Sequence, residues 1–328
     1  MEKDGQGSLL MSNVSFLIPC FNASAHLEPM LKSVLSNMEM DDDIIVVDDH
    51  SQDDSTARAK HILSQANVHH TVTTNPGKGA CSARNHAFSL AQGELIQWLD
   101  ADDILGPDKL AKQRQHLEAQ SSELVVSPFA SFIGTPEHGT INENRDWSSP
   151  PNPTPADWLA SGQMTIPACW LGHRSVFEKA GKWDESLLVN QDGEYFARVL
   201  AAANRLRFEG TVHVHYRKGN AGSVSRFSAE KADSLFRSVE SIHTTASSLK
   251  TSERMQQMVA NKYQHAIYTA FPHCPEGAAR AKAALKTLPK PTISNPNAVS
   301  TLSKGISFLL GWKSLTRLRM LKTQFRAA

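Results

Sequence analysis

Cysteines are few in this chain, and none of them is placed for a metal site or a disulfide framework. Its 328 residues include four cysteines, which stand far apart and form no CxxC pair. That spacing argues against a zinc site and against a disulfide-stapled scaffold. The formal net charge is only +1, so the overall balance does not suggest a nucleic-acid-binding domain, and we expect no nucleic-acid partner.

Long hydrophobic runs are also missing. The sequence has no apolar N-terminal segment of the signal-peptide kind and no run of about 18 apolar residues. We therefore expect neither a signal peptide nor a membrane-spanning helix, and a cytoplasmic location. The two Asn-X-Ser sequons, at Asn13 and Asn22, are expected to be unused, because one overlaps a predicted buried strand.

The familiar phosphate-binding loops are absent as well. No GxxxxGK[ST] pattern occurs, which excludes the usual nucleotide hydrolases. The stretch GKGACSARN contains Gly77 and Gly79 but lacks GxGxxG, so it does not support a nicotinamide oxidoreductase. It does open a predicted helix that carries Arg84. That arginine either faces an anion at the helix N-terminus or is an ordinary solvated residue.

Apolar runs and amphipathic segments alternate through the first 120 residues. The predicted strands are VSFLIP, DIIVVDDHS, VHHTVTT and ELIQWLDADD. The predicted helices are SAHLEPMLKSVLSNM, STARAKHILSQA, GACSARNHAFSLAQG and PDKLAKQRQHLEAQ. Short connections between alternating elements favour an α/β fold with right-handed crossovers and a parallel sheet covered by helices.

The pattern loosens from about Pro128. Residues 148–158 are proline-rich and predict a loop, a helix follows Gln191, and RFEGTVHVHYR predicts one strand. After about Ser228 the chain is expected to be helical throughout. No internal repeat of a convincing period is present.

The stretch IQWLDADDILGPD runs from an apolar strand directly into Asp100, Asp102 and Asp103. Asp48 and Asp49 end another predicted strand in the same way. Each Asp alone is readily explained as a turn or capping residue. Two acidic clusters at the same edge of one sheet favour a cation or polyol ligand, and oxygen-only ligation suits Mg²⁺ or Mn²⁺ shared with a substrate phosphate.

Four successive motifs, from VSFLIPCFNASAHLEPMLKSVLS through IIVVDDHSQDDS and GACSARNHAFSLAQGELIQWLDADDILGPDKL to QDGEYFARVL, resemble those of the family-2 inverting glycosyltransferases. The resemblance covers roughly residues 14–225. It implies the GT-A fold, a Rossmann-like mixed, mainly parallel sheet flanked by helices, here with a C-terminal helical extension. The implied domains are 11–227, with a nucleotide-sugar half at 11–127 and an acceptor half at 128–227, followed by the extension at 228–328.

The resemblance also implies roles for residues on the donor side. Pro19 and Phe21 would line the base pocket, with Phe21 stacking on the ring. Asp49 would accept a hydrogen bond from the base N3–H, which favours uracil or thymine. Arg84 would lie near the nucleotide. The family more often has tyrosine at the position of Phe21, so one hydroxyl contact is lost here.

The same resemblance assigns the metal and the base. Asp100 and Asp102 would form the acidic DXD pair beside ribose and metal (Mn²⁺ or Mg²⁺), with Asp103 as an adjunct. Asp192 would be the general base, although this chain has Gln-Asp where the family usually has Glu-Asp. Glu194 is a rival base, but two residues along a helix it points roughly 200° away from Asp192.

The implied activity is transfer of a sugar from a nucleotide-diphosphate donor, expected to be a UDP-sugar, to a glycan or lipid-linked acceptor hydroxyl with inversion. The alternative is a glycosyltransferase-like protein that binds nucleotide sugars without turnover. A sugar-nucleotide pyrophosphorylase is a weaker alternative, because PCFNASAHLEP after the first strand contains no glycine.

Three features keep two interpretations each. Trp158, Trp170 and Trp183 either stack on acceptor sugars or pack in the core. His213 and His215 either bind metal or serve a structural or acceptor-site role. The basic, amphipathic tail from residue 301 either lies on an anionic membrane surface, as a peripheral contact at the cytoplasmic face, or packs on the protein or a partner subunit.

Overall fold

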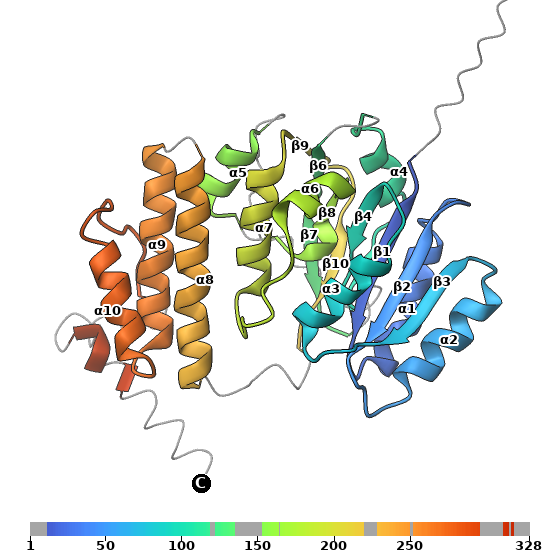
Figure 1. Cartoon of the computed structure of the whole chain (residues 1–328), viewed down its shortest axis with the longest axis horizontal. Coiled ribbons are helices and arrows are strands. Elements are labelled where there is room, and N and C mark those ends of the chain that lie inside the picture. The colour runs from blue at the N-terminus through green and yellow to red at the C-terminus, as the bar shows by residue number, and fades with distance from the viewer. Residues whose placement is uncertain are drawn as a thin grey trace, which may run out of the picture. The chain divides into compact units, whose positions relative to one another are not determined.

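In the computed structural model the chain forms two compact units (Figure 1). The first, here called the sheet unit, comprises Met1–Pro155, Met164–Glu185 and Ala202–Ser223. The second, here called the helical unit, comprises Ala156–Gln163, Ser186–Ala201 and Val224–Ala328. The structure describes residues 12–118, 122–134, 153–163, 165–219, 228–249, 252–295, 311–314 and 316–317. The first ten residues, most of the proline-rich stretch and most of the basic tail lie outside these ranges.

The sheet unit is built on a seven-stranded sheet. Its strands are β1 (Val14–Cys20), β2 (Asp43–Asp48), β3 (His69–Thr74), β4 (Leu95–Trp98), β6 (Glu123–Val126), β8 (Trp170–His173) and β9 (Arg205–Phe208). Their order is β3-β2-β1-β4-β8-β6-β9, and all neighbours are parallel except β8, which runs antiparallel to β4 and β6. The prediction of a mixed, mainly parallel sheet is confirmed.

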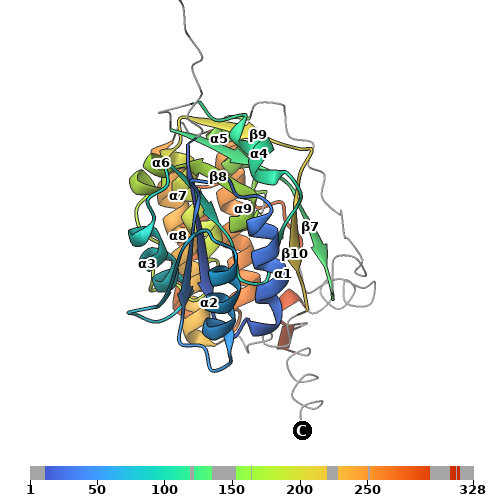
Figure 2. The same ribbon diagram turned by 90° about the vertical axis from the view of Figure 1, so that its right-hand side faces the viewer.

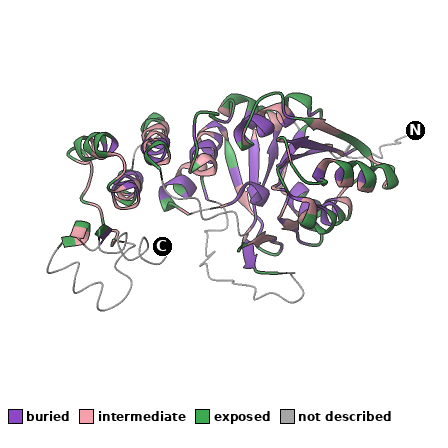
Figure 3. Cartoon of the chain, turned by 90° about the horizontal axis from the view of Figure 1, so that it is seen from below, coloured by how far each residue is buried: buried purple, intermediate pink, exposed green. Residues whose placement is uncertain are grey.

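Helices of the sheet unit connect these strands. They are α1 (Ser24–Leu35), α2 (Ser55–Gln65), α3 (Ala80–Leu90), α4 (Lys109–Arg114), the 3₁₀ turn η1 (Pro167–Cys169) and α6 (Arg174–Ala180). Right-handed crossovers place α1 and α2 on one face, and the return from β3 to β4 places α3 on the other (Figure 2). The central strands β1, β2 and β4 are buried almost throughout, as expected for parallel strands covered on both faces (Figure 3).

A second, three-stranded sheet has the order β5-β10-β7 and consists of β5 (Ile104–Leu105), β7 (Phe129–Phe132) and β10 (Val214–Arg217). The prediction of one strand over RFEGTVHVHYR is wrong, because β9 pairs in the large sheet and β10 in the small one. A turn separates them, in which Glu209 accepts hydrogen bonds from the Thr211 N–H, at 2.7 Å, and hydroxyl. The polar turn therefore redirects the chain from one sheet to the other.

The helical unit contains α5 (Pro155–Ser161), α7 (Gln191–Ala202), α8 (Ala229–Ser248), α9 (Glu253–Ala270) and α10 (Pro275–Ala284). Ser228 and Ser252 cap α8 and α9, each accepting a hydrogen bond from the backbone N–H three residues later at 3.2 Å. Helices α8, α9 and α10 pack on one another. Among the described helices, none is long and apolar enough to cross a membrane. The functional division into 11–227 and 228–328 stays a prediction; α5 and α7 cluster with the later helices.

One lysine of the sheet unit is fully buried and has no carboxylate partner among the residues that the structure describes. The Lys109 ammonium donates to Gln97 Oε1 and to Gln113 Oε1, both at 2.6 Å. Burial lowers the pKa of Lys109 to about 7. Two neutral amide oxygens can accept from an uncharged amine, whereas they compensate a buried positive charge poorly.

This burial predicts a pH-dependent stability. The folded-state pKa of Lys109 is below its unfolded value near 10.4, so between the two the unfolded chain binds more protons and stability rises with pH. We expect the advantage of wild type over Lys109→Met in unfolding free energy to grow by about 1.4 kcal/mol per pH unit between pH 7.5 and 9.5. Urea denaturation of both proteins across that range measures it. A pH-independent difference would show that Lys109 stays charged.

Candidate active site

The carboxyl ends of β1, β2 and β4 meet at one edge of the large sheet. Backbone hydrogen bonds tie the ends together: the Asp49 N–H donates to Cys20 O at 2.7 Å, and the Leu99 N–H to Leu17 O at 3.1 Å. Beyond this edge lies a cavity of about 690 Å³. Ligands of open parallel sheets bind in this position, outside the carboxyl ends of the strands.

Six residues singled out from the sequence line this one cavity: Pro19, Phe21, Asp49, Arg84, Asp100 and Asp102. They come from three strand ends and from the first turns of α3, and the fold brings them together. Phe21 is 59% exposed, and an accessible aromatic residue of this kind can stack on a planar base. Asp103 does not line the cavity; it is buried and accepts the Arg217 N–H at 3.2 Å. Asp192 belongs to the helical unit.

Asp49 is fixed by the loop that precedes α3. Both of its carboxylate oxygens accept from the Gly79 N–H at 2.9 Å, and Oδ1 also accepts from the Asn75 amide at 2.7 Å. Gly79 has φ +93°, a conformation that a residue with a Cβ adopts only under strain. The glycine in GKGACSARN therefore serves a backbone turn at the start of α3, and its N–H orients the Asp49 carboxylate.

Arg84 is held on two sides. Its guanidinium donates to Asp100 Oδ1 at 2.7 Å and lies 4.5 Å from the centre of the Trp183 ring. The Arg84 side chain is buried whereas Asp100 is partly exposed, so the pair presents its carboxylate to the cavity. The interpretation of Arg84 as a solvated surface arginine is wrong. A planar guanidinium stacked on an aromatic ring is a rigid cationic group beside the acidic residues.

The Asp102 carboxylate lies in surroundings that disfavour its charged form. Burial raises its pKa most, and the neighbouring Asp100 carboxylate raises it further, while His26 and Arg217 act in the opposite direction. A cation in the cavity would oppose both causes of the shift. The described residues contain no group of three or more His, Cys, Asp or Glu side chains that could hold a metal alone. The residues thus fit a Mg²⁺- or Mn²⁺-type site with one or two carboxylates and the remaining ligands from a diphosphate and water.

Two further residues contribute to this site and were not identified from the sequence. His26 lines the cavity from α1, and its positive form favours ionisation of Asp102. Asn75 is buried below the Asp49 carboxylate. His26 directly precedes the buried residue Leu27 at the start of a predicted helix, a position at the strand-end rim that could have singled it out. Asn75 stands in a predicted loop and gave no comparable signal.

The two candidate bases, Asp192 and Glu194, both lie in the first turn of α7, and their contacts differ. Gln191 begins the helix, the Glu194 N–H donates to the carbonyl of the preceding Asn190 at 3.1 Å, and Asp192 lies within the first turn. Glu194 is buried, accepts from both the Nε and Nη2 of Arg198 at 2.7 and 2.8 Å, and also accepts from the Ser241 hydroxyl at 2.7 Å. These bonds occupy the Glu194 carboxylate and give it a structural role.

Two sets of residues had alternative interpretations, and the structure bears on both. Trp158, Trp170 and Trp183 are all buried, so none of the three offers a free ring face to an acceptor sugar. The rings of His213 and His215 lie 4.7 Å apart in an edge-on arrangement, but they belong to no cluster of three metal-ligating side chains among the described residues. The three tryptophans therefore belong to the packed interior, whereas the structural or acceptor-site role of the two histidines stays a prediction.

The sheet order, with one antiparallel strand inserted in a parallel sheet and acidic residues at the strand ends, defines a GT-A type glycosyltransferase fold. Residues 15–181 match the model of the glycosyl transferase family 2, and the chain belongs to this family. It is 30% identical over 140 residues to the putative teichuronic acid biosynthesis glycosyltransferase TuaG of Bacillus subtilis, a match covering 40% of this chain and 56% of TuaG. The chain spans about half the length of the curated relatives it matches.

Solved structures of glycosyltransferases share the fold. The S. aureus TarS fragment 1–349 in complex with UDP-GlcNAc superposes with a TM-score of 0.62 at 16% identity, covering 79% of this chain and 73% of TarS. The mannosyltransferase PcManGT from Pyrobaculum calidifontis, in complex with GDP-Man and Mn²⁺, gives a TM-score of 0.57 at 16% identity, covering 94% and 86%. At this level of identity the likeness concerns the fold.

Proposed function

We propose that the chain transfers a sugar from a nucleotide-diphosphate donor, a UDP-sugar, to an acceptor hydroxyl of a glycan or lipid-linked saccharide with inversion of configuration. The observation that carries the proposal is the single cavity at the strand ends, which gathers an exposed aromatic ring, an orienting carboxylate, a stacked arginine and an acidic pair. The proposal also draws on family membership and on the UDP-GlcNAc complex of TarS.

On the donor side, Phe21 stacks on the base and Asp49 accepts the base N3–H, while Pro19 completes the wall. The Asp49 carboxylate is held in place by Gly79 and Asn75 before any ligand enters, so little ordering is required on binding. Arg84 and Asp100 form the floor next to ribose and diphosphate. A divalent cation held by Asp100 and Asp102 would supply Lewis-acid stabilisation of the diphosphate charge.

In the transfer itself, Asp192 takes the proton of the acceptor hydroxyl. The acceptor oxygen then forms its bond to the anomeric carbon on the side opposite the diphosphate, and the bond from that carbon to the diphosphate oxygen breaks, which inverts the configuration. A positioned general base is typically worth about 10²–10⁴-fold in rate. Holding donor and acceptor together provides the remaining acceleration.

A thermal-shift screen tests the donor class. A ligand that binds only the native state at 100 times its dissociation constant stabilises it by about 2.7 kcal/mol. UDP-sugars with Mn²⁺ are therefore expected to raise the melting temperature more than GDP-, ADP- or CMP-sugars do, and product analysis would then detect sugar transfer. If no nucleotide sugar changes the melting temperature, the cavity is not a donor site.

Base selection by Asp49 gives a separate prediction. Asp49→Ala should weaken UDP binding more than GDP binding, by about 10-fold, since a hydrogen bond to a charged group contributes roughly 1.5–3 kcal/mol. Asn75→Ala is the companion variant: it loosens the loop that orients Asp49 without removing the carboxylate, so it should weaken UDP binding in the same direction but by less than Asp49→Ala does. Titration calorimetry of wild type and both variants with UDP and with GDP measures these six affinities. Equal losses of UDP and GDP affinity in Asp49→Ala would show that Asp49 only stabilises a turn.

A further inference from the structure

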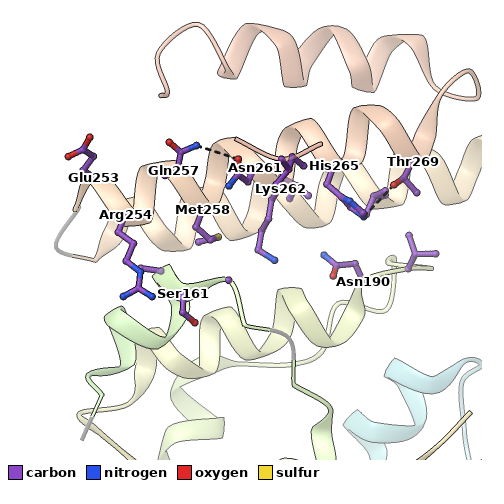
Figure 4. A pocket seen from close by; sticks show the side chains of 16 residues that line it. Ser161, Asn190, Glu253, Arg254, Gln257, Met258, Asn261, Lys262, His265 and Thr269 are labelled. Atoms are coloured by element: carbon purple, nitrogen blue, oxygen red, sulfur yellow. Dashed lines mark hydrogen bonds between the residues drawn. The ribbon is translucent and has the colours of Figure 1, made fainter. Parts of the chain in front are cut away.

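A second, larger cavity lies wholly within the helical unit. It has a volume of about 980 Å³ and is bounded by one face of α9, the end of α5 at Ser161, the segment at Asn190 and part of α8 (Figure 4). This volume is at the upper end of the range of small-molecule sites, about 300–1,000 Å³. None of the residues lining it contributes to the donor cavity of the sheet unit.

Cationic side chains of α9 point into this cavity. Arg254, Lys262 and His265 all line it, and Glu253 at one end is the single acid among the described residues of the lining. Neither the Arg254 guanidinium nor the Lys262 ammonium forms a hydrogen bond or ion pair with any residue that the structure describes. The eight-residue spacing places Arg254 and Lys262 about 12 Å apart along the helix, and Figure 4 shows Lys262 reaching from α9 toward Asn190.

Burial in the wall of the cavity disfavours the charged forms of Lys262 and His265. It lowers the pKa of Lys262, and it lowers the pKa of His265, to which the nearby Lys262 charge adds. A buried cation that lies near another cation is stabilised when a bound anion supplies the opposite charge. The lining thus has an excess of positive charge that the described residues do not neutralise.

The remainder of the wall is preformed and mixed in character. Asn261 Oδ1 accepts from the Gln257 amide at 3.3 Å and from the Thr292 N–H at 2.8 Å, which fixes the segment after α10 against α9. Leu235, Val239 and Met258 provide aliphatic surface, and among the described residues no Phe, Tyr or Trp side chain lines the cavity. Without a Phe, Tyr or Trp ring for stacking, the wall suits a nucleobase poorly. It suits a sugar, whose C–H faces pack on aliphatic groups while its substituents reach the polar side chains.

We propose that this cavity binds a saccharide carrying an anionic group, a phosphate ester or a carboxylate, with Lys262 and Arg254 as its charge partners. The proposal is independent of the proposed transfer, because the cavity shares no residue with the donor site. Phosphate oxygens and carboxylates share the chemistry that these cations recognise, with bidentate bonds from arginine and a point charge from lysine. Binding therefore requires both the sugar and the charge.

Titration calorimetry on the full chain tests the proposal with four probes: glucose 1-phosphate, glucuronate, neutral glucose and inorganic phosphate. We expect one or both anionic sugars to bind at least 10-fold more tightly than glucose and than inorganic phosphate. Tighter binding of glucose 1-phosphate would indicate a phosphate ester as the ligand group, and tighter binding of glucuronate would indicate a carboxylate. Equal affinity for glucose would remove the role of the charge, and equal affinity for inorganic phosphate would remove the role of the sugar.

Substitutions locate the binding in this cavity. Lys262→Met and, separately, Arg254→Gln should each weaken the anionic sugar by about 10-fold or more. Lys282→Met is the matched control, since Lys282 is an exposed lysine of α10 that does not line the cavity, and its removal should leave binding unchanged. Thermal melting checks that each variant is folded. Equal loss in the control, displacement by saturating UDP, or no binding of either anionic sugar would overturn the proposal.

Discussion

Asp102→Ala is expected to lower turnover by roughly two orders of magnitude or more and to remove its dependence on Mn²⁺ or Mg²⁺. The Lewis-acid effect of a bound cation is worth several kcal/mol, and each 1.36 kcal/mol is tenfold in rate. The variant should also be at least as stable as wild type in the absence of metal, because burial and Asp100 raise the pKa of Asp102 and make its charged form unfavourable in the folded state. Steady-state kinetics with titrated metal and metal-free melting curves measure the two effects.

Asp103→Asn is the control for this prediction. Asp103 belongs to the same acidic run but is buried away from the cavity, and an amide oxygen can still accept the Arg217 N–H. Its variant should lose some stability and keep the metal dependence of turnover. Two results would contradict the metal site: wild-type turnover unaffected by a chelator, or a metal response that survives in Asp102→Ala.

The first half of the fold could be predicted because its signals are local. Apolar runs gave β1, β2 and β4, and amphipathic spacing gave α1 and α3. The later strands could not be found in the same way. β6 and β8 have four residues each, and their pairing depends on partners far along the chain, including the antiparallel insertion of β8 next to β4. Short segments with long-range pairing carry little periodicity of their own.

The part of the site that lies at the strand ends could be predicted, because the strands themselves could be located in the sequence. Acidic residues after β2 and β4 meet because parallel strands present their carboxyl ends at one edge. Partnerships made by tertiary packing were not visible in the sequence: Arg84 stacks on Trp183, nearly 100 positions away, and Asp103 turns inward while Asp102 faces the cavity. A run of three similar carboxylates thus splits into different environments that only the fold assigns.

Asp192→Asn should lower kcat by about two to four orders of magnitude while donor affinity and melting temperature stay near those of wild type. A carboxamide is nearly the shape of a carboxylate but cannot take a proton. Asp192→Ala should remove the interaction of an acid with the first turn of α7, which costs about 0.3–1 kcal/mol in stability, and should also remove the activity. Rates with saturating donor, donor titrations and melting curves separate these effects.

Glu194→Gln provides the opposite pattern and completes the test. The Glu194 carboxylate is buried against Arg198 and Ser241, so this variant should lose stability, by about 1–3 kcal/mol, while retaining kcat per folded molecule. A binding protein without turnover would show no transfer in wild type and no difference between the two variants. Near-normal turnover in Asp192→Asn would leave a different group as the base. A large loss confined to Asp192→Asn, with donor binding intact, is the result expected of an enzyme that removes the acceptor proton through Asp192.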